Sequence, residues 1–429
     1  MEKKNEFKIQ IEDDSEIMTD YNQLILPSSS SSSLYKWQQQ ATDFFFNHDG
    51  YGLFTISTGA GKTFFSVHLI KKIWEIHPDY NILIVVPKNV ILETGWYKEL
   101  SENGILITKI GVYYGDIKEY AQITLTNMQN LHRIPLDYFD IGIFDEVHNY
   151  GTKKLLPYLK HNFKYKIGLT ATVERNDDAH YDIIDAFNDN VFDYSAESAL
   201  QDGVLNPFDF YNIGVELDDN SETEYEELTN SINTILSAYK SFNSIMRLNT
   251  PIKGRFLSLL NSRKQLVNNY PRKFDIVKAI CVKNKTDKII VFSQFNEQTN
   301  KIYWYLLDIG VTARIIHSGI NKQDRDKNLI DFKNNKFNVL LTSKVLDEGY
   351  NLPSIDTAII TAGDSTAKQT IQRMGRVLRR KNHKSKLYQI YCSNTIEEKQ
   401  SIQRSMMFKN LCDDFKEYFY GKNDTEIIL

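Results

Sequence analysis

Short apolar runs recur along this chain in two series, and helix-like sequence separates each run from the next. The runs lie at 53–56, 82–86, 123–125, 141–144 and 167–169 in the first series, and at 289–292, 314–316, 339–341, 357–360 and 387–390 in the second. Buried strands that alternate with crossover helices are typical of parallel sheets with both faces covered. The pattern therefore predicts an α/β fold with two parallel-sheet lobes in tandem.

Composition divides the chain further. Serines at 28–33 predict a flexible linker, and residues 218–273 lose the strand rhythm, begin acidic and end basic, which predicts a helical insertion. Such an insertion fits either a nucleic-acid grip or a solvated connector. The tail is expected to be helical because Phe408, Leu411, Phe415 and Phe419 recur at helical spacing. The predicted parts are an N-terminal segment and linker (1–33), the first lobe (34–203), a connector strand with the insertion (204–273), the second lobe (274–398) and the C-terminal helical tail (399–429).

Charge and cysteine content exclude several classes of protein. The formal net charge of −4 excludes nucleic-acid binding through bulk positive charge, although a local basic groove stays compatible with it. Cys281, Cys392 and Cys412 are far apart and form no CxxC pair, so neither a disulfide framework nor a zinc site is supported. No apolar run approaches the length of a membrane span. We expect a cytoplasmic protein that is neither secreted nor bound to a membrane.

A phosphate-binding loop follows the first apolar run. Its small residues would let main-chain N–H groups surround a phosphate at the start of a helix; they are Ser57, Thr58, Gly59, Ala60 and Gly61. Lys62 would reach the β- and γ-phosphates of ATP, and the Thr63 hydroxyl would bind Mg²⁺. The usual pattern has a further glycine where this chain has Ile56. The loop alone is therefore an incomplete signal.

Two carboxylates at the end of another apolar run strengthen the prediction. Asp145 and Glu146 follow the run at 141–144, which places them at the carboxyl edge of the predicted sheet. Asp145 would hold the Mg²⁺ shell, and Glu146 would orient and deprotonate the attacking water. An exposed acidic pair after a strand is a common alternative, but the phosphate loop upstream favours an ATP site.

With these residues in place, the chain from Leu34 to about Glu398 resembles the superfamily 2 helicases and translocases, whose two lobes are RecA-like. Gln38 matches the residue that reads adenine in the family, while Tyr35 stands where the family usually has arginine. Further matches lie at positions that the family uses against the nucleic-acid backbone or to couple ATP to the track. In the first lobe they are Pro87, Lys88, Thr126, Thr170 and Thr172.

The second lobe carries the rest of the resemblance. Ser293, Thr342 and Gly349 match its coupling and nucleotide-contacting positions, and Asn351 stands where the family often has aspartate. Arg376 and Arg379 share one face of a predicted helix, and we expect them to act as arginine fingers on the transferring phosphoryl group. Gln372 would lie near the γ-phosphate or the water.

The spelling of these motifs is most similar to the DNA-acting branch that includes XPB-like proteins, phage branch-migration helicases and restriction-type motors. The resemblance implies a DNA-dependent ATP hydrolase with ATP and Mg²⁺ as cofactors. It would act as a monomer on forked or branched DNA, largely independently of sequence, in a bacterium or a phage-infected host. An RNA helicase and an ATP-switched nucleic-acid clamp or motor subunit are the alternatives.

Overall fold

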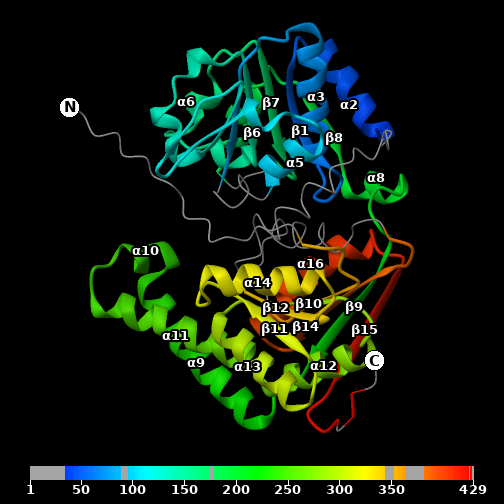
Figure 1. The fold of residues 1–429 in the computed structure, drawn as a ribbon. Coiled ribbons are helices and arrows are strands. Elements are labelled where there is room, and N and C mark those ends of the chain that lie inside the picture. The colour runs from blue at the N-terminus through cyan, green and yellow to red at the C-terminus, as the bar shows by residue number, and fades with distance from the viewer. Residues whose placement is uncertain are drawn as a thin grey trace, which may run out of the picture.

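A computed structural model of the chain describes residues 34–87, 95–173, 177–343, 352–362, 381–424 and 426–427. Two α/β lobes lie one above the other, and the chain crosses between them after the short helix α8 (Ala196–Gln201) (Figure 1). A bundle of helices extends from the lower lobe. The predicted fold class, two parallel-sheet lobes with a helical segment between them in sequence, is confirmed.

The first lobe is built on an eight-stranded sheet in the order β4-β3-β5-β2-β6-β7-β1-β8. Every neighbouring pair is parallel except β3 and β4, which form an antiparallel hairpin. The central strands are apolar and buried because helices cover both faces of the sheet. The strands are β1 (Tyr51–Ile56), β2 (Ile82–Val86), β3 (Ile110–Tyr114), β4 (Ile117–Lys118), β5 (Ile123–Asn127), β6 (Ile141–Asp145), β7 (Tyr165–Thr170) and β8 (Val191–Tyr194).

The helices of the first lobe pack their apolar faces on this sheet. The longest, α3, begins directly after Gly61, whose φ of 96° lies in the left-handed region that favours glycine. One packed core covers each face of this sheet, and the core that contains Trp37 and Phe65 continues into the second lobe. The α-helices are α2 (Lys36–Asn47), α3 (Lys62–Ile76), α5 (Tyr97–Glu102), α6 (Leu156–Leu159) and α7 (His180–Asp185), and the 3₁₀ helices are η2 (Ile107–Lys109), η3 (Met128–Arg133), η4 (Leu136–Tyr138) and η5 (Val147–Tyr150).

The second lobe is built on a seven-stranded, fully parallel sheet in the order β11-β12-β10-β13-β14-β9-β15. Its strands are β9 (Phe208–Val215), β10 (Ile289–Phe292), β11 (Ala313–Ile316), β12 (Val339–Thr342), β13 (Thr357–Ile360), β14 (Ser385–Cys392) and β15 (Asp414–Tyr420). The covering helices are α12 (Pro271–Lys283), α13 (Asn296–Asp308), α14 (Lys322–Lys333) and α16 (Ile396–Lys409).

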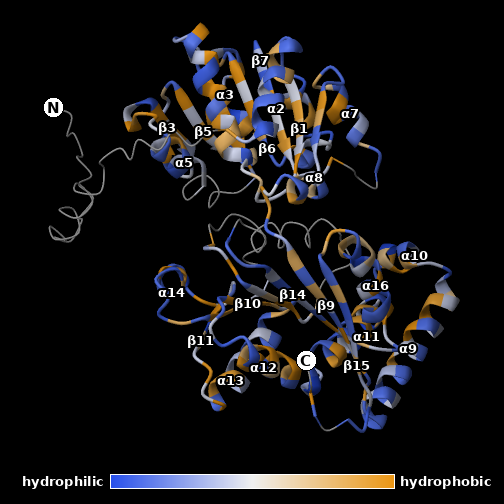
Figure 2. Cartoon of the chain, turned by 90° about the vertical axis from the view of Figure 1, so that its right-hand side faces the viewer, coloured by the Kyte–Doolittle hydropathy of each residue, from blue (hydrophilic) through white to orange (hydrophobic). Residues whose placement is uncertain are grey.

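The predicted insertion forms three helices, α9 (Asp219–Tyr239), α10 (Phe242–Arg247) and α11 (Pro251–Asn268), which we call the helical arm. Helices α9 and α11 lie side by side, and α10 caps their outer end (Figure 1). The arm has a small core of its own around Ile232, Ile245 and Phe256. Helix α9 is hydrophilic along most of its length (Figure 2). Few of its side chains are buried, among them Tyr225 and Ile232, so much of the rest of its surface faces solvent.

The segment expected to contain a connector strand includes β9, which is a full member of the second sheet and pairs with β14 and β15. The expected helical tail is wrong for 414–420, because Phe415 and Phe419 lie on the edge strand β15. Their four-residue spacing places both on one side of a strand as well as of a helix, so the periodicity did not discriminate between the two.

No helix in the described ranges combines the length and the apolar character needed to cross a membrane.

Candidate functional site

Three neighbouring strand ends of the first sheet bring the predicted catalytic residues together. Strand β7 lies between β1 and β6 and is parallel to both. The phosphate loop follows β1, Thr170 ends β7 and Asp145 ends β6. Since the carboxyl ends of parallel strands share one edge, the sheet topology converts residues far apart in sequence into one site.

The phosphate loop is a tight turn with two glycines in the left-handed region. Gly59 has φ 89° and Gly61 has φ 96°, and the Ala60 N–H donates to the Ser57 carbonyl over 3.2 Å. The Lys62 ammonium donates to the Ile56 carbonyl at 3.1 Å, so it lies folded back across the loop. Thr63 is half-buried in the first turn of α3. The loop thus places a cation and a hydroxyl at a helix N-terminus.

Gln38 closes the loop from the side of α2. Its Oε1 accepts the Tyr35 N–H at 3.0 Å, whereas its buried Nε2 has no hydrogen-bond partner within the described residues. The same is true of the buried Thr58 Oγ1. A Cβ atom on Gly61 would lie 3.3 Å from Gln38 Nε2. Buried polar groups without partners are rare, so these two atoms fit a polar ligand such as a nucleotide.

Both carboxylate oxygens of Asp145 hold a hydrogen bond. Oδ2 accepts the indole N–H of Trp96 at 2.9 Å, and Oδ1 accepts the Glu146 N–H at 3.0 Å. Burial raises the pKa of Asp145, while the Trp96 hydrogen bond, the Lys62 charge and the Glu146 N–H act in the opposite direction. The carboxylate is therefore held in one orientation beside the lysine of the phosphate loop.

Glu146 adopts a left-handed backbone with φ 50°, which is uncommon for a residue with a side chain. Its Oε2 lies 3.3 Å from His148 Nδ1, and the same nitrogen lies 3.0 Å from Thr170 Oγ1. Thr170 in turn donates to the Thr172 carbonyl at 2.6 Å. These contacts join Glu146 to the end of β7, and we call the four residues the Glu146–Thr172 relay.

Three of the predicted nucleic-acid contacts, which lie at or near strand ends, have buried hydroxyls. Thr126 Oγ1 donates to the Tyr113 carbonyl at 2.8 Å, and Thr342 Oγ1 donates to the Ser343 carbonyl at 2.8 Å. Ser293 Oγ lies 3.1 Å from the Thr342 carbonyl and also contacts Thr299. In this conformation these side chains tie strand ends together and do not face solvent. Pro87 lies half-buried just after β2.

The second half of the predicted ATP site falls outside the described residues. It comprises Gly349, Asn351, Gln372, Arg376 and Arg379, and Lys88 in the first lobe lies outside them too.

The residues present fit ATP with a divalent cation. Lys62, Gln38 and the main chain of the loop provide donors for a nucleotide, and Asp145 and Thr63 are oxygen ligands of the kind that Mg²⁺ prefers. Nowhere in the described ranges do three or more His, Cys, Asp or Glu side chains gather as a metal cage.

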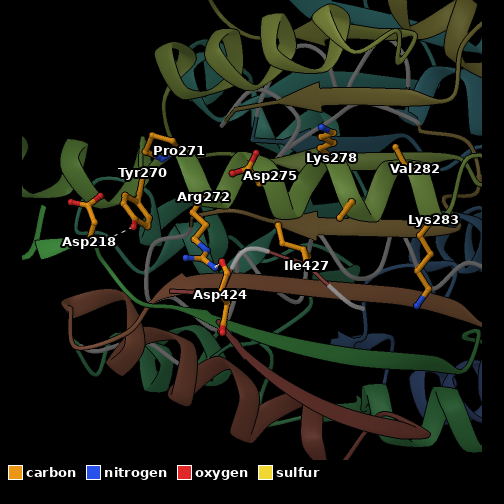
Figure 3. A pocket seen from close by; sticks show the side chains of 11 residues that line it. Asp218, Tyr270, Pro271, Arg272, Asp275, Lys278, Val282, Lys283, Asp424 and Ile427 are labelled. Carbon is orange, nitrogen blue, oxygen red and sulfur yellow. Dashed lines mark hydrogen bonds between the residues drawn. The ribbon is translucent and has the colours of Figure 1, made fainter. Parts of the chain in front are cut away.

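A cavity of about 800 Å³ lies elsewhere, between α12 and the C-terminal loop (Figure 3). Two of its charged groups are engaged with other residues: Arg272 donates to the Lys422 and Asp424 carbonyls, and Asp275 accepts from the Tyr305 hydroxyl. The cavity contains none of the predicted site residues.

Comparison with known families matches both lobes. The family of the type III restriction enzyme res subunit matches residues 31–175, and the helicase conserved C-terminal domain matches residues 272–381. The chain carries the two domains of a superfamily 2 helicase. The predicted resemblance is thereby confirmed, and the two matched domains are those of ATP-dependent helicases.

Several curated relatives of this chain are XPB-like or Rad25-like DNA translocases or helicases. It is 27% identical over 369 residues to the DNA 3'-5' translocase XPB2 of Sulfurisphaera tokodaii, covering 82% of this chain and 80% of the relative. It is 22% identical over 361 residues to the DNA 3'-5' helicase XPB of Mycobacterium tuberculosis, covering 81% of this chain but 58% of that relative. The helicase domain of Pyrococcus furiosus Hef has a similar fold, with a TM-score of 0.60, 17% identity, and coverage of 85% of this chain and 96% of that domain's chain.

Sequence reasoning missed two residues of the site. Trp96 was not assigned a role, because its segment gives no sign that the indole reaches Asp145. Sequence reasoning also gives His148 no role, although its position two residues after Glu146 is a usable signal. Both contacts depend on how separate strands and helices pack.

Proposed function

We propose that this protein is an ATP-driven DNA helicase or translocase that acts on forked or branched duplexes in replication, recombination or repair. The observation that carries the proposal is the phosphate loop beside Asp145 and Glu146 in a superfamily 2 chain whose relatives include a DNA 3'-5' translocase. The motif spelling, which resembles the DNA-acting branch, supports DNA over RNA as the track. A monomeric enzyme of the cytoplasm of a bacterium or a phage-infected host is part of the proposal.

In this proposal, each residue of the first lobe has one task. Lys62 and the N–H groups of the loop bind the phosphates, Gln38 reads the base, and Glu146 orients the attacking water and accepts its proton. Asp145 and Thr63 would hold Mg²⁺, which when bound neutralises charge on the β- and γ-phosphates.

The second lobe would complete the site. Arg376 and Arg379 would stabilise the phosphoryl group in the transition state, with Gln372 near the water and Gly349 near the nucleotide. Closure of the lobes on ATP and opening after hydrolysis would move the track.

The nucleic acid would lie across both lobes and be bound mainly through its phosphates. Pro87 and Lys88 would contact the backbone directly. Because the hydroxyls of Thr126, Ser293 and Thr342 are buried on main-chain carbonyls, their segments would contribute main-chain groups while the side chains fix the loop geometry. Thr170 and Thr172 would couple the track to the ATP site.

The helical arm would supply the strand-separating element. Three of its basic side chains have partners within the protein: Lys253 donates to the Met246 carbonyl, Arg263 donates to Thr229, and Lys264 lies over the Phe295 ring. Arg247 and Arg255 are exposed. Two apolar side chains near them are also exposed, Phe242 by 50% and Leu257 by 40%, and together these four suit a wedge that meets bases and phosphates.

An ATPase and strand-displacement panel tests the proposal. Fork DNA, Holliday junctions, blunt duplex, single-stranded DNA and RNA would each be added to the full chain. We expect the strongest ATPase stimulation and displacement with branched DNA. Selective stimulation by RNA would show that RNA, and not DNA, is the nucleic acid along which the protein moves. ATP binding without hydrolysis on any of these nucleic acids would favour an ATP-switched clamp.

Charge reversal tests the arm separately. Arg247→Glu with Arg255→Glu should reduce fork unwinding at least about tenfold through lost phosphate contacts and leave ATP affinity unchanged. The matched control is Lys285→Glu with Lys399→Glu, which reverses two exposed charges on the body of the second lobe. Equal unwinding by both double variants would reduce the arm to a connector.

A further inference from the structure

Trp96 is buried, with 1% of its surface exposed, just before α5, and its indole N–H donates to Asp145 Oδ2 at 2.9 Å. We propose that Trp96 is a positioning residue for the cation of the ATP site, because it fixes the orientation in which Asp145 presents its carboxylate. The inference rests on the proposed function, in which Asp145 holds Mg²⁺. Trp96 would not bind the cation itself, but would hold the carboxylate of its ligand Asp145 through a hydrogen bond.

The geometry leaves little freedom to the carboxylate. The Glu146 N–H occupies Oδ1 and the Trp96 indole occupies Oδ2, so rotation about the side-chain bond would break a hydrogen bond at each oxygen. Each oxygen keeps a further lone pair for a cation. Groups that orient a metal ligand in this way typically change metal affinity about 10- to 100-fold when removed.

Comparison with the other tryptophans of the first lobe argues against simple packing. Trp37 is equally buried, yet its indole N–H has no hydrogen-bond partner in the described part of the chain. The indole N–H of Trp74 donates to the Tyr80 main-chain carbonyl at 3.0 Å. A buried indole in this lobe therefore does not need an anionic partner, and Trp96 is the one of the three that meets the carboxylate.

The position of Trp96 in the fold suits this task. Helix α5 packs against α3, the helix that starts with Lys62 and Thr63. One helix pair therefore carries the lysine of the phosphate loop, the predicted hydroxyl ligand and the indole that holds the carboxylate. Asp145 is the only partner in this set that comes from the sheet, at the end of β6.

The test measures cation binding directly. Mn²⁺ replaces Mg²⁺ as the probe, and free Mn²⁺ is followed by electron paramagnetic resonance with ADP present. Trp96→Phe keeps an aromatic side chain and removes the N–H, so the dissociation constant for Mn²⁺ should rise about tenfold, as expected for a lost hydrogen bond to a charged group. ADP affinity in EDTA should be unchanged.

Trp74→Phe is the matched control, because it removes an indole hydrogen bond of similar length from the same lobe. It should bind Mn²⁺ like the wild type. Equal Mn²⁺ affinity for Trp96→Phe and Trp74→Phe would overturn the inference. If the wild type itself binds no Mn²⁺ with ADP, the proposed ATP site fails first, which is a distinct result.

A spectroscopic arm decides the matter if Trp96→Phe does not fold. In a variant with Trp37, Trp74 and Trp304 replaced by Phe, Trp96 is the single emitter. Its emission should shift when Mn²⁺ is added to the ADP-bound protein, and Asp145→Asn should abolish that response. Emission that ignores the cation, or that responds equally in Asp145→Asn, would show that the indole does not report on the carboxylate.

Discussion

The Nδ1 atom of His148 lies 3.0 Å from Thr170 Oγ1, and the direction of this hydrogen bond can be assigned. Thr170 has one hydroxyl proton, and it is directed to the Thr172 carbonyl at 2.6 Å. The threonine oxygen must therefore accept from His148, so Nδ1 carries a proton. The same N–H faces Glu146 Oε2 at 3.3 Å, which joins the predicted general base to the end of β7.

Breaking the Glu146–Thr172 relay should uncouple ATP hydrolysis from movement along the nucleic acid. Thr170→Val keeps the side-chain shape and removes the hydroxyl that links His148 to Thr172. We expect nucleic-acid-stimulated ATPase to fall about threefold to tenfold, as for a lost hydrogen bond of about 1 kcal/mol, and strand displacement to fall much further. Thr124→Val, at a fully buried threonine on β5 of the same sheet, is the control. Parallel losses in both assays would contradict a coupling role.

Glu146→Gln should bind ATP and hydrolyse it poorly. The amide keeps the size of the side chain but cannot accept a proton from water, so turnover should fall about 10²- to 10⁴-fold while ATP affinity stays within about threefold of wild type. Binding of a fluorescent ATP analogue and steady-state phosphate release measure the two quantities. Hydrolysis at the wild-type rate would remove Glu146 from the role of general base.

A methyl group on Gly61 should damage the phosphate loop specifically. Gly61→Ala forces an L-residue to φ 96° and places its Cβ 3.3 Å from Gln38 Nε2. Gly104→Ala is the matched control, because Gly104 also has a positive φ of 80° but its Cβ would meet nothing within 4 Å. We expect both variants to lose about 1 kcal/mol of stability from backbone strain, and only Gly61→Ala to lose ATP affinity. Nucleotide titration with thermal unfolding checks both effects.

Lys166 should make stability rise with pH. Burial lowers its pKa to about 8 from the ordinary 10.5, so the folded protein binds fewer protons at this site than the unfolded chain. The cost of the buried charge is full below pH 8 and disappears as pH rises to 10.5, a gain of up to about 3 kcal/mol. Lys166→Met should flatten this rise in urea unfolding measured at pH 7.5 and 9.5, whereas Lys164→Met on the surface should not. An identical slope for Lys166→Met and wild type would contradict the assignment.

The buried pair of Lys273 and Glu397 should anchor the base of the helical arm. The Lys273 ammonium contacts both carboxylate oxygens, at 2.9 and 2.8 Å, and donates to the Val267 carbonyl at the end of α11. Lys273→Met leaves a buried carboxylate without its cation and should cost about 3–5 kcal/mol in the free energy of unfolding. Adding Glu397→Gln should restore part of that loss. Additive losses in the double variant would show that the two charges do not interact.

The sequence predicts most of the strands in their order along the chain, but it does not predict every strand. The runs at 82–86, 289–292 and 357–360 coincide with β2, β10 and β13, because continuous apolar residues mark strands buried on both faces. Strands β9 and β15 interrupt their apolar residues with Asp, Asn, Lys or Glu, which the pattern does not separate from a loop or a helix. Their places became visible only through pairing with β14 and with each other.

Site residues could be predicted from local sequence where a single segment of the chain determines their geometry. The turn at Gly59 and Gly61 and the carboxylates that end β6 follow from neighbouring residues. The Trp96 indole and the burial of Thr126 and Thr342 depend on packing between distant segments, and local sequence carries little information about it. The relative placement of Arg376 and Arg379 stays a prediction.

The position of β9 between β14 and the edge strand β15 constrains how the second lobe can be made. Asn212 on β9 meets Gln389 on β14 across 177 residues of sequence, and β15 arrives later still. During synthesis β9 leaves the ribosome directly after the first lobe and must wait, without either neighbour, while the arm and four other strands are translated. We therefore expect a fragment ending before 204 to fold on its own, and a second lobe begun at 274 to expose the vacant edge of β14 and aggregate.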